Sequence, residues 1–248
     1  MRSRRISTTL TRTGTSGAAG SDAAHLPASD AGGSPAQPLP GAASHRGHEV
    51  SALSEVRIAL AHAAATLADV GVPYVVIGGQ ASALLGRARA SCDIDLLVKP
   101  EDVGTALQAF ATAGFKTEEV NPNWLHKAFR GAVLIDVLFK TKGDIYLDDE
   151  MLEHAVLREA GGRLVHVMAP EDLLVIKALA HDEETSRHWF DALGLIAANR
   201  LDWPYLLRRA AKGPRRVLSL LVYATSVDLV VPADVVRRLQ DDIFARGE

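Results

Sequence analysis

The hydrophobic pattern changes period along the chain, and these changes predict the order of the elements. Over residues 55–70 the apolar side chains recur every three or four positions, which is typical of an amphipathic helix. Gly71 ends this helix, and the apolar, largely β-branched residues 74–77 then indicate a buried strand. Residues 93–98 and 132–139 place polar side chains between apolar ones, as half-buried strands do.

The remaining segments extend this pattern into a mixed fold. The further expected elements are helices over 100–113 and 144–157, strands over 115–120, 124–130 and 163–168, and helices over 170–181, 184–198 and from 206 onward. We therefore predict an α+β protein with an α/β core, in which helices flank a mixed sheet over residues 50–168 and a helical lobe follows over 169–248.

Residues 1–49 have a different composition from the rest. They are rich in Ser, Thr, Gly, Ala and Pro and show no apolar period. Such a segment cannot bury enough surface to offset the entropy lost on ordering it. We expect a disordered, low-complexity tail, or alternatively a start codon assigned too far upstream.

Overall composition narrows the class of protein. With 48% hydrophobic and 23% charged residues, the chain resembles ordinary soluble proteins, and no apolar run approaches the ~20 residues that span a bilayer, so no membrane partner is expected. A net charge of −3 gives no bulk attraction to nucleic acid. The single cysteine, Cys92, is consistent with a reducing compartment, so we expect a cytoplasmic location.

Two local features carry chemistry. Gly78 and Gly79 follow an apolar strand and precede a short helix, where backbone N–H groups without Cβ atoms nearby can approach a phosphate. Farther on, Asp93 and Asp95 alternate along a strand and therefore share one face. Two adjacent carboxylates repel each other unless a cation lies between them, so this pair predicts a metal site.

The order of these motifs resembles a known signature. The motif comprises a Gly-Gly turn, a basic spacer with a serine, an Asp-x-Asp strand and a later aspartate within an apolar strand: Gly78, Gly79, Arg87, Arg89, Ser91, Asp93, Asp95 and Asp136. It is similar to the nucleotidyltransferase superfamily related to DNA polymerase β, and more narrowly to the AbiEii-like toxin group and its uncharacterised relatives. Gly79 departs from the serine that many active members carry there, although the AbiEii-like branch often has Gly-Gly.

The resemblance implies a two-metal site. Asp93 and Asp95 would bind the Mg²⁺ that holds the triphosphate. Asp136, with either of them, would bind the Mg²⁺ that activates the acceptor hydroxyl, or would itself act as the general base. The alternative is that Asp93 caps a strand and Asp136 is a charge on an edge strand.

The same resemblance implies nucleotide contacts from Gly78, Gly79, Arg89 and Ser91. Arginine and serine side chains suit triphosphate oxygens, because a guanidinium donates two parallel hydrogen bonds and a hydroxyl adds another. The alternative for the basic residues is a solvated loop, and for Arg87 the two interpretations are equally favoured.

Lys177 lies on or beside the apolar stripe of the helix over 170–181, where a solvent-facing lysine is not expected. Its ammonium requires an anion, either a triphosphate or a carboxylate. In the related family the matching lysine touches the nucleotide, and an aspartate that Asp191 resembles assists catalysis or holds the lysine. Asp191 could alternatively form a helix-surface pair with Arg187.

Other polar residues were assigned lesser roles. His181, His188, Trp189 and Trp203 are expected to pack or cap rather than to act in catalysis. The basic group over 208–216 would either receive a polyanion such as tRNA or form a solvated helix face.

These features predict a Mg²⁺-dependent nucleotidyltransferase that moves an NMP from an NTP to an acceptor. RNA, in particular tRNA, is the favoured acceptor, with a protein antitoxin as a conditional partner. The alternatives are transfer to a small molecule such as an aminoglycoside, transfer to a protein, or a non-catalytic nucleotide-binding module. The base of the NTP stays open.

Overall fold

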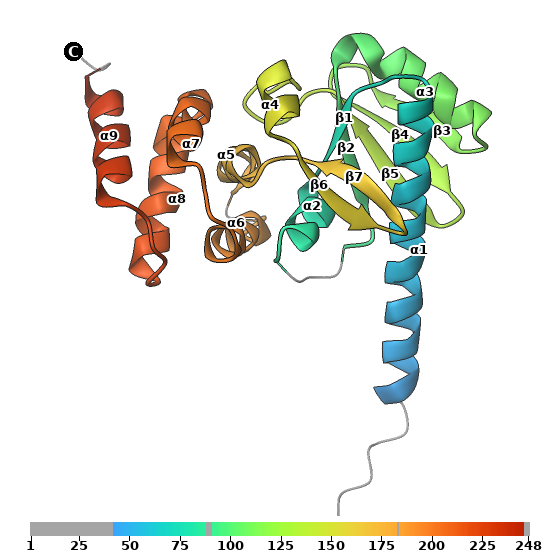
Figure 1. The fold of residues 1–248 in the computed structure, drawn as a ribbon, viewed down its shortest axis with the longest axis horizontal. Coiled ribbons are helices and arrows are strands. Elements are labelled where there is room, and N and C mark those ends of the chain that lie inside the picture. The colour runs from blue at the N-terminus through green and yellow to red at the C-terminus, as the bar shows by residue number, and fades with distance from the viewer. Residues whose placement is uncertain (1–41, 88–90, 183, 246–248) are drawn as a thin grey trace, which may run out of the picture. The chain divides into compact units, whose positions relative to one another are not determined.

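The computed structural model describes residues 42–87, 91–182 and 184–245, and residues Gly41–Glu248 form one compact unit. Figure 1 shows the arrangement of the elements within this unit. In chain order they are α1 (Ala42–Asp69), β1 (Tyr74–Ile77), α2 (Gly78–Leu84), β2 (Ile94–Val98), η1 (Pro100–Asp102), α3 (Val103–Thr112), β3 (Lys116–Asn121), β4 (Leu125–Arg130), β5 (Val133–Leu138), α4 (Asp149–His154), β6 (Val156–Ala160), β7 (Arg163–Val167), α5 (Pro170–Ala180), α6 (Arg187–Ala198), α7 (Trp203–Arg209), η2 (Ala210–Lys212), α8 (Pro214–Ser226) and α9 (Ala233–Phe244).

The strands of the described ranges form one mixed sheet in the order β3-β4-β5-β2-β1-β7-β6. β2 pairs parallel to β5 and β1 parallel to β7, while the other neighbours are antiparallel. Because parallel neighbours need a crossover, the chain passes through α3 and the β3–β4 hairpin between β2 and β5. The mixed sheet flanked by helices confirms the predicted α+β class.

Helices cover the sheet and connect it to the C-terminal segment (Figure 1). α1 packs against α3, β5, β6 and β7, whereas α2 packs against β1, β2 and α6. α5 contacts α6, α7 and α8, and its residues from Pro170 to Ala178 are all buried. A helix buried on every side lacks a simple polar face, which explains why even its acidic and basic residues lie inside the protein.

Three sequence expectations differ from the structure. The first helix begins at Ala42 rather than at residue 55, since its early residues form helix without an apolar stripe to mark it. The helix predicted over 144–157 is limited to α4, because residues 156–160 form β6 and pair with β7. The helix expected from residue 206 begins earlier, as α7 at Trp203. The Asp202 side chain caps it by accepting a hydrogen bond from the Tyr205 N–H at 3.0 Å.

Residues 1–41 lie outside the described residues, and the division of the compact unit near residue 168 stays a prediction. Within the described ranges, no helix has the length and apolar character needed to cross a membrane.

Candidate active site

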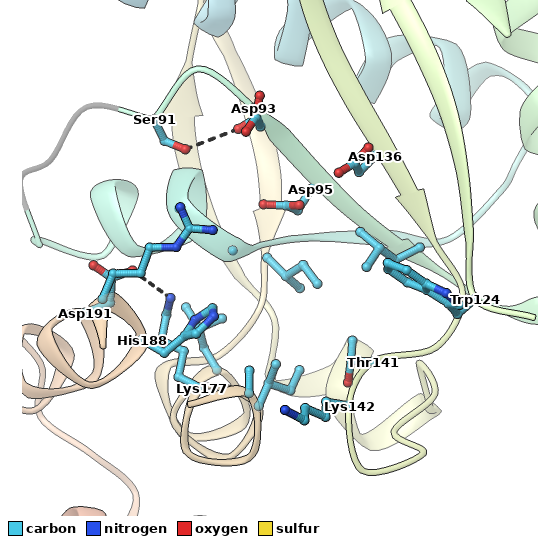
Figure 2. Close-up of a pocket in the computed structure, with 18 of the residues that line it drawn as sticks. Ser91, Asp93, Asp95, Trp124, Asp136, Thr141, Lys142, Lys177, His188 and Asp191 are labelled. Carbon is cyan, nitrogen blue, oxygen red and sulfur yellow. Dashed lines mark hydrogen bonds and ion pairs between the residues drawn. The ribbon is translucent and has the colours of Figure 1, made fainter. Parts of the chain in front are cut away.

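A pocket of about 920 Å³ opens beside the strands of the central sheet. Its walls come from β1 and the turn after it, from the segment leading into β2, from β5 and the loop that follows it, and from α5 and α6. Figure 2 shows the side chains that line it. Its volume lies within the range of small-molecule sites, about 300–1,000 Å³.

Asp93, Asp95 and Asp136 all line this pocket. The parallel pairing of β2 with β5 places Asp95 directly opposite Asp136. Asp93 lies just before β2, which begins at Ile94, so it is more exposed than its two partners. Figure 2 shows the three carboxylates grouped on one side of the pocket. The register of one strand pair therefore brings together residues that are 41 positions apart in sequence (136 − 95).

The group carries unbalanced negative charge. Burial raises the pKa of Asp95 to about 6, and repulsion from Asp136 and then Asp93 adds to this rise, while the Gly79 N–H and Lys177 oppose it. A carboxylate with a raised pKa in a cleft is typical of a functional site, because the protein holds a charge there that folding alone does not favour.

Gly78 makes room for Asp95. Its φ is +66°, in the left-handed region, and a Cβ built on it would overlap Oδ2 of Asp95. The next residue, Gly79, donates its backbone N–H to the same carboxylate. The turn therefore holds a carboxylate, and its contact with phosphates stays a prediction that would require a triphosphate to share or replace this N–H.

Lys127 pairs with Asp136. These residues are register partners across β4 and β5, and the Lys127 Nζ lies 2.9 Å from Asp136 Oδ1. Both side chains are about one-quarter exposed or less, at 25% and 20%. The ion pair places one positive charge next to the carboxylates and occupies one oxygen of Asp136.

The three aspartates suit a hard divalent cation, which prefers carboxylate oxygens. They do not form a ready-made ligand cluster, since no group of three His, Cys, Asp or Glu side chains gathers closely enough in the described part of the chain. The mutual repulsion that raises the pKa of Asp95 is the feature that a cation would relieve. The residues thus fit a metal in charge and donor type.

Lys177 of α5 and Asp191 of α6 form a buried ion pair at the other side of the pocket. The Nζ to Oδ2 distance is 2.9 Å, and the side chains are 3% and 2% exposed. The anion near Lys177 is thus a carboxylate, and Asp191 pairs with Lys177 rather than serving only the helix surface. Because both residues also line the pocket, a bound anion could approach this pair.

Two residues in the first turn of α6 also line the pocket, Arg187 and His188. Burial lowers the pKa of His188 to about 4, and the positive charges of Lys177 and Arg187 lower it further. The imidazole is therefore neutral near pH 7 and can donate or accept a hydrogen bond. From the sequence, His188 is expected only to pack or cap, so its place in the pocket lining adds to that expectation.

The pocket contains most of the residues singled out from the sequence: Gly78, Gly79, Ser91, Asp93, Asp95, Asp136, Lys177 and Asp191. Arg89 lies outside the described residues.

Gln80 fixes the segment that leads into β2, because its buried amide donates to the Ser91 carbonyl at 2.6 Å. The Arg87 side chain instead packs against α6, where a Cβ on Gly194 would overlap its Cδ.

Two residues of the basic group over 208–216 hold α7 against its neighbours. Arg209 is buried and bonds to Asp172 at 2.6 Å and to Asp148 at 2.9 Å, whereas the more exposed Arg208 pairs with Glu150 at 3.0 Å. These contacts tie α7 to α4 and α5. Arg209 therefore has a structural role, and binding of a polyanion by the rest of the group stays a prediction.

The sequence gives no site role to several residues that line the pocket, Trp124, Lys140, Thr141, Lys142 and Arg187, or to Lys127, which pairs with Asp136. Lys127 could be found only from the register of β4 against β5. The others belong to a hairpin turn, a loop and a helix start, whose places in space no hydrophobic period encodes.

Fold and site together define a nucleotidyltransferase, in which a mixed sheet presents aspartates beside a glycine turn. The family described as "Uncharacterised nucleotidyltransferase" matches residues 42–227, and the chain belongs to this family. It is accordingly a transferase enzyme. No curated protein matches the sequence.

Solved structures share the fold at low identity. An antigenic nucleotidyltransferase-like protein from Paracoccidioides brasiliensis is 16% identical with a TM-score of 0.50, over 76% of this chain and 94% of that one. ANT(2″)-Ia in complex with adenylyl-2″-tobramycin is 18% identical, with a TM-score of 0.46 over 68% and 97%. MenT4, a nucleotidyltransferase toxin from Mycobacterium tuberculosis H37Rv, is 14% identical, with a TM-score of 0.41 over 65% and 64%. At such identities the likeness concerns the fold alone.

Proposed function

We propose that this enzyme transfers an NMP group from an NTP to a hydroxyl group of an RNA acceptor such as tRNA, in a Mg²⁺-dependent reaction. The acceptor oxygen forms a bond to the α-phosphorus, the bond from this phosphorus to the bridging oxygen breaks, and pyrophosphate leaves. The observation that carries the proposal is the grouping of Asp93, Asp95 and Asp136 in one pocket.

Magnesium bound by these aspartates would neutralise the triphosphate and lower the pKa of the acceptor hydroxyl. Asp136 would orient that hydroxyl and take its proton, and Lys127 donates to one of its oxygens, Oδ1. Asp93 and Asp95 would hold the triphosphate side of the metal site.

The opposite side of the pocket supplies positive charge for the leaving pyrophosphate. Arg187 lies there together with Lys177, whose charge Asp191 balances at 2.9 Å until a phosphate competes for it, and the neutral His188 adds a hydrogen-bonding group. Phosphoryl-type transfer depends mainly on positioning and charge neutralisation, so cations at this end would steady the charge that develops on the leaving group.

RNA is favoured as acceptor by the cations that line the pocket away from the three aspartates. These are Lys140 and Lys142 of the loop after β5, with Asp144 as the carboxylate of this loop that lines the pocket, and Arg187 of α6. A polycationic small molecule would meet these cations, while a phosphodiester backbone is attracted by them. An AbiEii-like toxin role, with a protein antitoxin as partner, follows as the biological form of this proposal.

The test uses the full chain with each α-labelled NTP, Mg²⁺ and total cellular RNA. We expect label in tRNA-sized RNA, lost in Asp93→Asn/Asp95→Asn and kept in Asp69→Asn, which changes an exposed aspartate at the end of α1. Label in an added aminoglycoside but in no RNA would overturn the acceptor class. Mg²⁺-dependent NTP binding without any label transfer would indicate a binding module instead.

For the toxin role, growth of cells that express the chain is the measurement. Arrest that the Asp93→Asn/Asp95→Asn variant abolishes, and that a co-expressed partner protein relieves, is expected. Normal growth at full expression of an active enzyme contradicts this role.

A further inference from the structure

The site pocket has two chemically different ends. One end contains Lys177, Arg187 and His188, and the other contains Trp124 and the loop after β5. Figure 2 shows Asp136 on the same side of Asp95 as Trp124, and β5, which carries Asp136, lies between β2 and β4 in the sheet. If the triphosphate lies toward the cationic α5–α6 end, the acceptor enters from the Trp124 end.

Trp124 presents an unusual surface there. Its side chain is 41% exposed although it lines the pocket. Its backbone is fixed, since the Trp124 N–H donates to the Asn121 carbonyl at 3.3 Å and the Phe139 N–H donates to the Trp124 carbonyl at 3.1 Å. An exposed indole on an anchored backbone offers a flat apolar face at little further cost in conformational entropy.

The loop after β5 suits a phosphodiester strand. It adjoins Trp124, whose carbonyl accepts from the Phe139 N–H, and its Lys140 and Lys142 also line the pocket. Lys140 pairs with Asp144 at 2.7 Å, and Lys142 lies 3.8 Å from Asp182, which follows α5. Ion pairs of exposed side chains are weak, so a phosphate can replace the carboxylate. Thr141 lies between the two lysines, and its buried hydroxyl has no hydrogen-bond partner among the described residues.

We propose that Trp124 is the stacking platform for a nucleobase of the acceptor strand, while Lys140 and Lys142 contact the adjacent phosphates. This inference rests on the proposed function, which it deepens by naming the residues that select a nucleic-acid acceptor. A single-stranded 3′ end fits best, because its bases are free to stack on an aromatic side chain. Stacking of this kind is tolerant of base identity, so the subsite would select strand chemistry more than sequence.

The test measures binding without turnover. Fluorescein-labelled hexa-adenylate RNA is titrated with the full chain in EDTA, and anisotropy gives the dissociation constant. We expect Trp124→Ala to weaken binding about 5- to 100-fold and Trp124→Phe to keep most of it. The matched control is Phe244→Ala, which removes an exposed aromatic of α9 that is absent from the pocket lining. Lys140→Gln/Lys142→Gln should reduce the salt dependence of binding.

A second titration separates the two ends of the pocket. Calorimetry with Mg²⁺ and α,β-methylene-ATP should give the same affinity for wild type and Trp124→Ala. Loss of nucleotide affinity with unchanged RNA affinity would overturn the inference, because Trp124 would then hold the base of the NTP. Equal RNA affinity in Trp124→Ala and Phe244→Ala would also overturn it. Both titrations measure binding without label transfer. Their failure would therefore overturn the role of Trp124 and not the proposed reaction, which the label-transfer assay tests separately.

Discussion

Lys127 Nζ lies 2.9 Å from Oδ1 of Asp136, across the β4–β5 pair and beside Asp95. The lysine places a positive charge against Asp136. It partly offsets the repulsion within the group of aspartates, and it would compete with a metal ion for one carboxylate oxygen.

Replacing Lys127 with methionine should therefore make the protein more dependent on Mg²⁺. We expect Lys127→Met to lower the free energy of unfolding by about 1 kcal/mol without metal, since an ion-paired carboxylate loses its partner. The rise in melting temperature on adding Mg²⁺ should be larger than in wild type. Lys116→Met is the control, because Lys116 pairs with Glu118 at the exposed edge of the sheet. An equal Mg²⁺-induced shift in both variants would contradict this prediction.

The buried pair of Lys177 and Asp191 should be costly to break from either side. Lys177→Met leaves a buried carboxylate without its cation, so we expect a loss of about 3–5 kcal/mol in urea unfolding. The double variant Lys177→Met/Asp191→Leu removes both charges and should recover much of this stability, while label transfer stays abolished.

That double variant separates a structural role from a functional one. Full activity in the stable double variant would show that the pair only holds α5 against α6. A double variant as unstable as Lys177→Met would instead indicate that packing, rather than the unpaired charge, dominates the cost.

Asp95 should destabilise the metal-free protein at neutral pH. Its pKa in the folded state, about 6, exceeds the ordinary value for an aspartate of 3.8, so the folded state binds the proton more tightly than the unfolded chain. Stability from this group is gained as pH falls from 6 toward 4 and is lost as pH rises through 6. In EDTA at pH 7.5, Asp95→Asn should raise the free energy of unfolding by about 1–3 kcal/mol, and this gain should vanish near pH 4.

Melting curves at several pH values check this prediction. Asp144→Asn is the control, because the hydrogen bond from Lys140 lowers the pKa of Asp144 and its removal gives no gain at pH 7.5. A gain for Asp95→Asn that persists unchanged at pH 4 would show that its cause is not the buried charge.

Gly78→Ala should disrupt the metal site more than the fold. The new Cβ would collide with the Asp95 carboxylate, and the alanine would have to adopt the positive φ that Gly78 has. We expect loss of label transfer and of the Mg²⁺-induced rise in melting temperature. Gly104→Ala, in α3 where a Cβ meets no atom within 4 Å, should instead stabilise by about 0.5–1 kcal/mol. Mg²⁺ stabilisation of Gly78→Ala equal to wild type would refute the prediction.

Local sequence signals predicted the central part of the fold well. A few adjacent residues are enough to predict the β-branched run of β1, the glycine pair after it and the lone Asp136 within an apolar strand. The structure places these features around one pocket. Lys177 was also marked locally, since a lysine on an apolar helix stripe requires an anion. The family resemblance offered Asp191 as a residue that could hold it, and the packing of α5 against α6 shows the two in an ion pair.

Features that depend on pairing between distant segments were not predictable. Lys127 reaches Asp136 because of strand register, and Trp124 reaches the pocket because of a hairpin turn. The helix predicted over 144–157 includes the first two residues of β6, and residues 158–160 carry no strand prediction, because the exposed alternate residues of β6 leave a weak strand pattern that pairing with β7 stabilises. The sequence marks Gly78 and Gly79 as a site where the backbone can approach another group closely. That this group is the Asp95 carboxylate follows only from the pairing of β1 with β2.

The parallel pairing of β2 with β5 also means that a metal site formed by Asp95 and Asp136 depends on the correct strand register. A slip of one residue would turn Asp136 into the apolar core and bring Val137 opposite Asp95. A slip of two residues would keep the face but separate the carboxylates by about 6.6 Å more along the strand, too far to share one ion. A metal ion that binds both aspartates therefore stabilises only the native register. Metal binding by a refolded molecule would show that β2 and β5 are correctly aligned.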